Sequence, residues 1–195
     1  MRSFFLAAAV GVAALGTIQL SGPAPAQAQQ QTFPRLQALP PSSRDALTDW
    51  LQRDCSVGLT ASITAGLIAI PGVDEAVLIE AYRQGPAPEL ERASTAAFDQ
   101  AYQERNVTLA QEGAELLGAE DTARLLGVSR DDYVKRRLDD ARLNYRTNAV
   151  HGLGAIGTEA SLTLLAPIAA DPADPLRSAA QAATETIRGR AKSSN

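Results

Sequence analysis

Residues 145–157, YRTNAVHGLGAIG, decide the fold, because a matching stretch, LRSAAQAATETIRG, begins 31 residues later at Leu176. The pairs that this offset aligns are Val134–Leu165, Asp140–Asp171, Tyr145–Leu176, Arg146–Arg177, Ala149–Ala180 and Ile156–Ile187. A looser echo lies upstream, where residues 85–90 correspond to residues 171–176. A period of this length is typical of stacked helix pairs, in which one pair cannot bury its own apolar face.

The composition of the 195-residue chain favours an all-α fold. Alanine, the strongest helix former, is the most abundant residue, whereas only 5% of the residues are aromatic. Helical patterns with turn signals between them run from Ser43 onward, including a helix bracketed by Gly118 and Gly127 and a capping signal at Ser129. Leu59–Ile70 is apolar on nearly all sides, which predicts a buried helix. The net charge of −4, with no basic block, argues against nucleic acid as a partner.

The repeated C-terminal stretch resembles HEAT-repeat proteins, especially the short-repeat variety related to phycobilisome lyases. Residues 145–157 look like the first helix of that repeat, and residues 162–171 look like its second helix. The resemblance covers about residues 134–190 and implies a short α-solenoid of stacked antiparallel helix pairs whose surface holds a protein partner. It also implies that Asp171 and Arg177 form an ion pair between helices.

The first 28 residues have the layout of a secretory signal peptide. Arg2 provides the positive start, residues 4–20 are mainly apolar, and Ala26-Gln27-Ala28 ends a polar segment as a small-x-small cleavage site. We predict cleavage after Ala28 and export to the periplasm or the medium. The alternative is an uncleaved membrane anchor, for which 17 residues with two glycines and a glutamine are short.

The remaining chain divides into four parts. Residues 29–42 are polar and contain prolines, which predicts a flexible leader. Residues 43–128 form a helical region of degenerate repeats or an unrelated cap. Residues 129–190 form the HEAT-like repeats, and residues 191–195 form a tail.

Few residues offer catalytic or metal-binding chemistry. Cys55 and His151 are the sole cysteine and histidine, so a site rich in these ligands cannot be assembled. Cys55 is a candidate free thiol in an exported protein, or a small buried residue. Gly152, Gly154 and Gly157 fit the G-x-G-x-x-G pattern of dinucleotide sites, but the helical stretch before them indicates helix packing instead.

The sequence therefore predicts an exported HEAT-like scaffold that binds a protein of the cell envelope, without catalytic activity, cofactor or metal and, after cleavage, without a membrane span. Arg137, Arg142 and the acidic pairs 131–132 and 139–140 are candidate contacts at the rim of the binding surface. The acidic pairs also fit a solvated helix face with i,i+4 ion pairs. The alternative is a redox-linked or hydrolytic envelope factor that uses Cys55 or His151.

Overall fold

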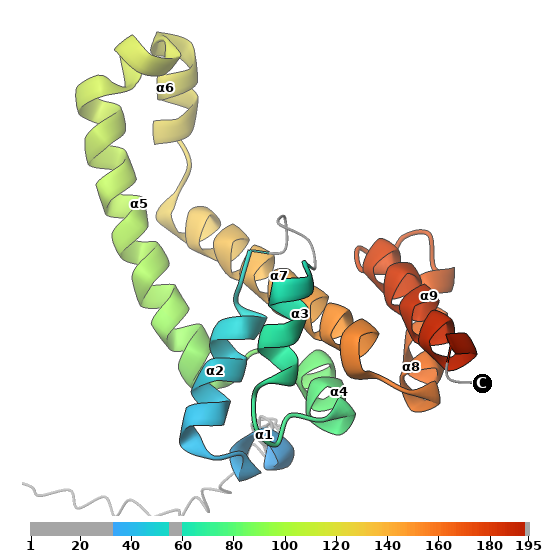
Figure 1. The fold of residues 1–195 in the computed structure, drawn as a ribbon. Coiled ribbons are helices and arrows are strands. Elements are labelled where there is room, and N and C mark those ends of the chain that lie inside the picture. The colour runs from blue at the N-terminus through green and yellow to red at the C-terminus, as the bar shows by residue number, and fades with distance from the viewer. Residues whose placement is uncertain (1–32, 55–59, 194–195) are drawn as a thin grey trace, which may run out of the picture. The chain divides into compact units, whose positions relative to one another are not determined.

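The computed structural model describes residues 33–54 and 60–193, and these residues form helices and connecting turns without a strand (Figure 1). The described helices are α1 (Pro34–Ala38), α2 (Pro41–Leu51), α3 (Ala61–Ile68), α4 (Glu75–Gln84), α5 (Pro88–Leu117), α6 (Ala119–Leu126), α7 (Arg130–Ile156), α8 (Glu159–Ala170) and α9 (Arg177–Ser193). The all-α prediction is confirmed. In the described ranges no helix is long and apolar enough to cross a membrane. Ala28 and Cys55 lie outside the described residues.

Helix α7 is the element on which most of the fold is packed. Helices α2, α3, α4, α5 and α9 all contact it, and α8 packs on α9 (Figure 1). The second half of α7 supplies the side chains of this core, among them Tyr145, Ala149, Val150 and Leu153, which are almost completely buried. Helix α6 packs on α5.

Local signals in the sequence placed several helix ends correctly. Gly118, with a φ of +85°, ends α5 and precedes α6, and Gly127 ends α6. The Ser129 hydroxyl accepts a hydrogen bond from the backbone N–H of Asp132 and caps α7. Helix α3 differs from its prediction. Leu67 is buried there but Ile68 is 62% exposed, because α3 is shorter than the apolar run and presents only one side to α7.

The predicted flexible leader is wrong for residues 33–42. This stretch contains α1 and the start of α2, and Phe33, Leu36 and Leu39 join the hydrophobic core. The reason lies in α4, where the buried Glu80 carboxylate accepts hydrogen bonds from the backbone N–H groups of Arg35 (3.1 Å) and Leu36 (2.9 Å). A carboxylate at a helix N-terminus satisfies donors that have no partner within the helix.

Helix α4 uses a second carboxylate, Glu75, to hold the start of α8. Glu75 accepts hydrogen bonds from the backbone N–H and hydroxyl groups of both Thr158 and Ser161. Burial raises the pKa of Glu75, but the hydrogen bonds from Ser161 and Thr158 outweigh burial and hold the pKa below its ordinary value of 4.5. Because the folded state has the lower pKa, this carboxylate stabilises the fold above the unfolded pKa, and the stabilisation is lost as the pH falls through the folded value.

We therefore expect Glu75→Gln to make the free energy of unfolding less dependent on pH in acidic solution. The free energy of unfolding of the variant should be lower than that of the wild type by about 1–3 kcal/mol at neutral pH. This difference should shrink as the pH falls below about 4.5, where the carboxylate of the unfolded chain becomes protonated, and should be smallest below the lower pKa of the folded state. Urea unfolding at a series of pH values measures it, and a difference that stays constant down to pH 2 would contradict the assigned role.

Two amides of α7 hold the end of α2. Asn148, which is buried, donates from Nδ2 to the carbonyl oxygens of Leu51 (2.9 Å) and Arg53 (2.7 Å). Asn144, one turn earlier, donates to the carbonyl oxygens of Gln52 and Arg53. The carbonyl groups at a helix C-terminus have no partner in their own helix, so these amides tie α2 to α7.

The three glycines of the G-x-G-x-x-G pattern lie where α7 meets its neighbours, as the helix-packing interpretation predicts. A Cβ on Gly152 would lie 2.9 Å from Leu78 Cδ1, and a Cβ on Gly154 would lie 3.0 Å from Ala183 Cα. At the end of α7, Arg190 of α9 donates to the carbonyl oxygens of Gly154 and Gly157. Small residues thus let α4 and α9 approach α7 closely.

We expect Gly154→Ala to destabilise the protein by about 1–3 kcal/mol, because the added methyl group meets the backbone of α9, which cannot rotate away. Gly189→Ala is the matched control, since a Cβ there meets nothing within 4 Å. Alanine in place of an open helical glycine should stabilise the fold by about 0.5–1 kcal/mol. Thermal unfolding of both variants checks this, and an equal effect at the two positions would disprove the close approach at Gly154.

Candidate functional site

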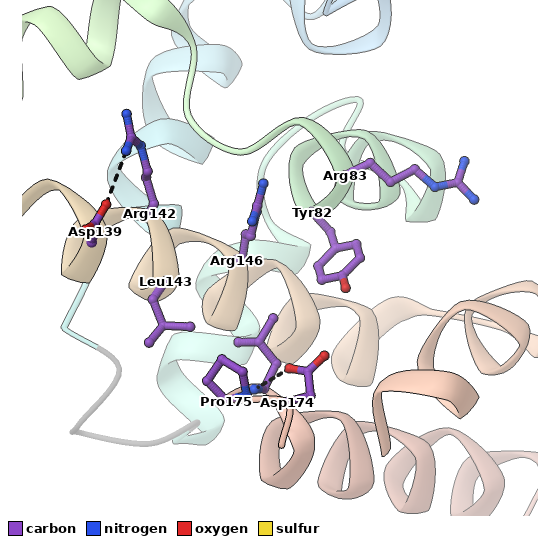
Figure 2. Close-up of a pocket in the computed structure, with 9 residues that line it drawn as sticks. Tyr82, Arg83, Asp139, Arg142, Leu143, Arg146, Asp174 and Pro175 are labelled. Atoms are coloured by element: carbon purple, nitrogen blue, oxygen red, sulfur yellow. Dashed lines mark hydrogen bonds and ion pairs between the residues drawn. The ribbon is translucent and has the colours of Figure 1, made fainter. Parts of the chain in front are cut away.

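A solvent-open groove of about 570 Å³ lies where α4, α7 and the turn before α9 meet (Figure 2). We call it the α4–α7 groove. Its lining residues are Tyr82, Arg83, Asp139, Arg142, Leu143, Arg146, Asp174, Pro175 and Leu176.

Helix geometry explains why the groove is rich in arginine. Asp139, Arg142 and Arg146 are three and four residues apart on α7, so they share one face of that helix. Tyr82 and Arg83 lie in the last turn of α4, just before Gly85. Gly85 has a φ of +74°, a conformation that favours glycine, and the Arg146 guanidinium lies beside it, with Nη2 3.6 Å from where a Cβ would be.

Arg142 is held by acidic partners. Its Nε and Nη2 atoms pair with the two carboxylate oxygens of Glu91 at 2.6 and 3.1 Å, and Nη1 pairs with Asp139 at 3.3 Å. The hydrogen bonds from Arg142 lower the pKa of Glu91 despite its partial burial. Figure 2 draws the contact with Asp139. Arg142 therefore joins α5 to α7 and has little donor capacity left for a ligand.

Arg83 and Arg146 differ from Arg142. Both are exposed, and neither forms a hydrogen bond or an ion pair with any residue in the described ranges. In Figure 2 the Arg83 side chain points away from the groove, whereas Arg146 rises from its centre. Arg146 is thus the cation of the groove that is best placed for a ligand.

Tyr82 and Asp174 supply the other polar groups. Burial raises the pKa of Tyr82, Asp174 raises it further, and Arg146 opposes them. The phenol therefore stays protonated at neutral pH and keeps its hydrogen for donation. Asp174 Oδ1 accepts a hydrogen bond from the backbone N–H of Leu176 (2.8 Å), which fixes the carboxylate at the edge of the groove.

His151 does not line this groove. It lines a cavity of about 590 Å³ between α3, α7 and α9, and another of about 460 Å³ that shares Leu143 and Pro175 with the groove. Small and apolar residues such as Ala155, Ala182 and Ala183 form much of the lining of the larger cavity. Burial lowers the pKa of His151, so the imidazole is neutral at pH 7. In the described part of the chain no side chain is hydrogen-bonded to His151, so the structure does not place it in a catalytic constellation.

The predicted ion pair between Asp171 and Arg177 is not formed, although both residues are described. The Asp171 carboxylate instead accepts a hydrogen bond from the backbone N–H of Ala173, two residues later (2.8 Å). Such a local turn contact competes with a longer-range pair and fixes the aspartate within its own loop.

Most of the other predicted surface residues have structural partners, whereas Asp140 forms no hydrogen bond or ion pair with a described residue. Arg137 stacks over the ring of Phe98 at 5.4 Å, and Lys135 pairs with Asp139 four residues later at 2.8 Å, as expected for a solvated helix face.

Across the described ranges no group of three or more histidine, cysteine or acidic residues could hold a metal ion.

The sequence did not single out Arg146 or Tyr82 as site residues. A signal for Arg146 was present, because the 31-residue offset aligns it with Arg177 and both are exposed. Tyr82 had no such signal, because nothing local to residues 80–84 indicates that the loop before α9 faces it.

Comparison of the chain with protein-family models, with curated proteins and with solved structures found no match. The resemblance to HEAT repeats therefore depends on the residues and motifs of this chain.

Proposed function

We propose that this protein is an exported, non-catalytic interaction module of the HEAT-like type, and that it binds a protein of the cell envelope in the α4–α7 groove. The observation that carries this proposal is the exposed Arg146, which lies in an open groove and forms no hydrogen bond or ion pair with another residue of the described ranges. Surface arginines are enriched at protein interfaces, where their planar donor group recognises acceptors of a partner.

The burial of the repeated positions supports the HEAT-like part of the proposal. Ala149 and Ala180 are both fully buried, and Tyr145 and Leu176 are 2% and 5% exposed. Aligned residues thus have similar burial in α7 and in α9 with the residue before it, and the two helices contact each other. Stacking of equivalent helices is what a solenoid requires.

Export is supported by the order of charged, apolar and small residues at the N-terminus. The described fold begins at Phe33, so removal of residues 1–28 leaves every described helix complete. Sequencing of the N-terminus after secretion in a bacterial host tests this part. Gln29 as the first residue is the expected result, and a retained Met1 would contradict cleavage.

Site-specific photocrosslinking tests the binding surface. We would place benzoylphenylalanine at Leu143, which is 39% exposed in the groove, and at Leu116, which is 67% exposed near the end of α5, as the matched control. A discrete protein adduct from position 143 but not from position 116 is expected in intact cells. Adducts from neither position, or the same adducts from both, would contradict binding in the groove.

A further inference from the structure

We infer that the α4–α7 groove holds an extended acidic segment of the partner protein, with Arg146 binding an aspartate or glutamate side chain of that segment. This inference rests on the proposed function and adds the chemistry of the occupant.

The charge of Arg146 is available for a ligand. Arg142, one turn before it on α7, uses Nε, Nη1 and Nη2 on Glu91 and Asp139, whereas Arg146 has no such contact with a described residue. A guanidinium presents paired N–H groups that match the two oxygens of a carboxylate. Arg146 is thus a carboxylate receptor without an internal competitor in direct contact.

Arg146 is also well positioned. Its neighbour Tyr145 and Ala149, one turn later, are buried in the core, so the backbone of α7 is fixed at this point. The guanidinium passes beside Gly85, which has no side chain to push it away. A receptor group on a rigid helix loses less conformational freedom on binding than one on a loop.

The remaining polar groups fit the backbone of an extended peptide better than a small anion. Figure 2 shows the Tyr82 hydroxyl and the Arg146 guanidinium pointing in opposite directions, so the two groups face different parts of the groove. Tyr82 has a proton to donate to a peptide carbonyl. Asp174 uses Oδ1 on Leu176 and keeps Oδ2 for a peptide N–H. A chain that runs along the groove meets all three groups.

The acidic residues that line the groove favour a singly charged anion over a doubly charged one. Asp139 and Asp174 stand on the same groove as Arg146, and their charges disfavour a ligand with two negative charges at one point. A phosphate dianion is therefore a poorer occupant than a carboxylate.

Fluorescence anisotropy with the purified protein tests this inference. The probes are labelled 12-residue peptides with glutamate at every third position, the same peptides with glutamine, and both with a free or an amidated C-terminus. We expect the glutamate peptides to bind about tenfold more tightly than the glutamine peptides, since hydrogen bonds to charged groups are the stronger class. Amidation of the C-terminus should have no effect.

Variants identify the residues responsible. Arg146→Gln should weaken binding of the glutamate peptides about tenfold and leave the glutamine peptides unchanged. Tyr82→Phe should weaken both kinds of peptide by the same factor, because it acts on the backbone. Arg92→Gln is the control, since the Arg92 side chain is 71% exposed and pairs with Glu89 outside the groove. Circular dichroism verifies that each variant is folded.

The inference is overturned if no glutamate peptide binds saturably, if glutamate and glutamine peptides bind equally well, or if Arg146→Gln has no effect. A loss of binding on amidation would assign the site to a chain end instead. Crosslinking from position 143 together with any of these results would leave the proposed interaction module in place and reject its acidic partner. Failure of the crosslinking would reject the module itself.

Discussion

Leu78→Ala should lower the free energy of unfolding by about 2–5 kcal/mol, the range expected when a fully buried leucine is truncated. Leu78 of α4 is fully buried, and its Cδ1 atom lies 2.9 Å from the position that a Cβ of Gly152 would take. Removing the isobutyl group leaves a cavity between α4 and α7 that the tightly packed helices cannot close. Leu116→Ala, at a position 67% exposed, should change stability by less than about 0.5 kcal/mol.

The contact between Leu78 and Gly152 makes a stricter test available. In the wild type, Gly152→Ala forces a methyl group against Leu78 and should cost about 1–3 kcal/mol. In the Leu78→Ala background the cavity relieves the contacts with Leu78 and leaves that with Leu67 Cδ2 at 3.2 Å, so the same change should cost less than in the wild type. Urea unfolding of the four proteins gives the coupling energy of the pair. Additive effects would mean that the two residues do not touch.

Residues with local signals were predictable from the sequence. Ser129 caps a helix through the N–H three residues later, and Gly118 adopts a positive φ that few other residues tolerate. Both effects depend on a few neighbouring residues, so the ends of α6 and the start of α7 could be inferred without the rest of the fold.

Residues whose partners are distant in the sequence were not predictable. Residues 29–42 are rich in glutamine and proline, and the burial of the apolar residues among them depends on Glu80, which is 44 residues beyond Leu36. Likewise, Arg142 pairs with Glu91 at a separation of 51 residues. No periodicity specifies which acidic residue reaches which donor, so these contacts required the structure.

In the α4–α7 groove, too, some features follow from local sequence and others depend on distant residues. The spacing of Arg142 and Arg146 on one helical face follows from the sequence, and Arg142 was among the predicted rim residues. Which of the two keeps a free guanidinium depends on Glu91 of α5, and the wall formed by Tyr82 depends on how α4 meets α7. The sequence thus indicated a surface of α7 but not its receptor group.

Glu80→Ala should detach α1 from α4 and lower the free energy of unfolding by about 2–4 kcal/mol, because it removes a carboxyl acceptor from the buried N–H of Leu36 and the partly buried N–H of Arg35. Glu80 is 8% exposed and accepts from Arg35 and Leu36 at the first turn of α1. Without the carboxylate these N–H groups have no partner in their own helix. Glu115→Ala is the control, because Glu115 is exposed on α5 and should tolerate the change within about 0.5 kcal/mol.

Glu80→Ala should destabilise α1 more than the rest of the fold. A local effect of this kind distinguishes the loss of a helix cap from a general packing defect. Trypsin cleaves after arginine, and the bond after Arg35 lies within α1, next to the capped N–H of Leu36. In Glu80→Ala we expect this bond to be cut under native conditions at least about tenfold faster than in the wild type, since the local opening costs less free energy. Cleavage after Arg130, at the start of α7, should keep its wild-type rate. Equal acceleration at both bonds would show that Glu80 stabilises the whole core and does not specifically cap α1.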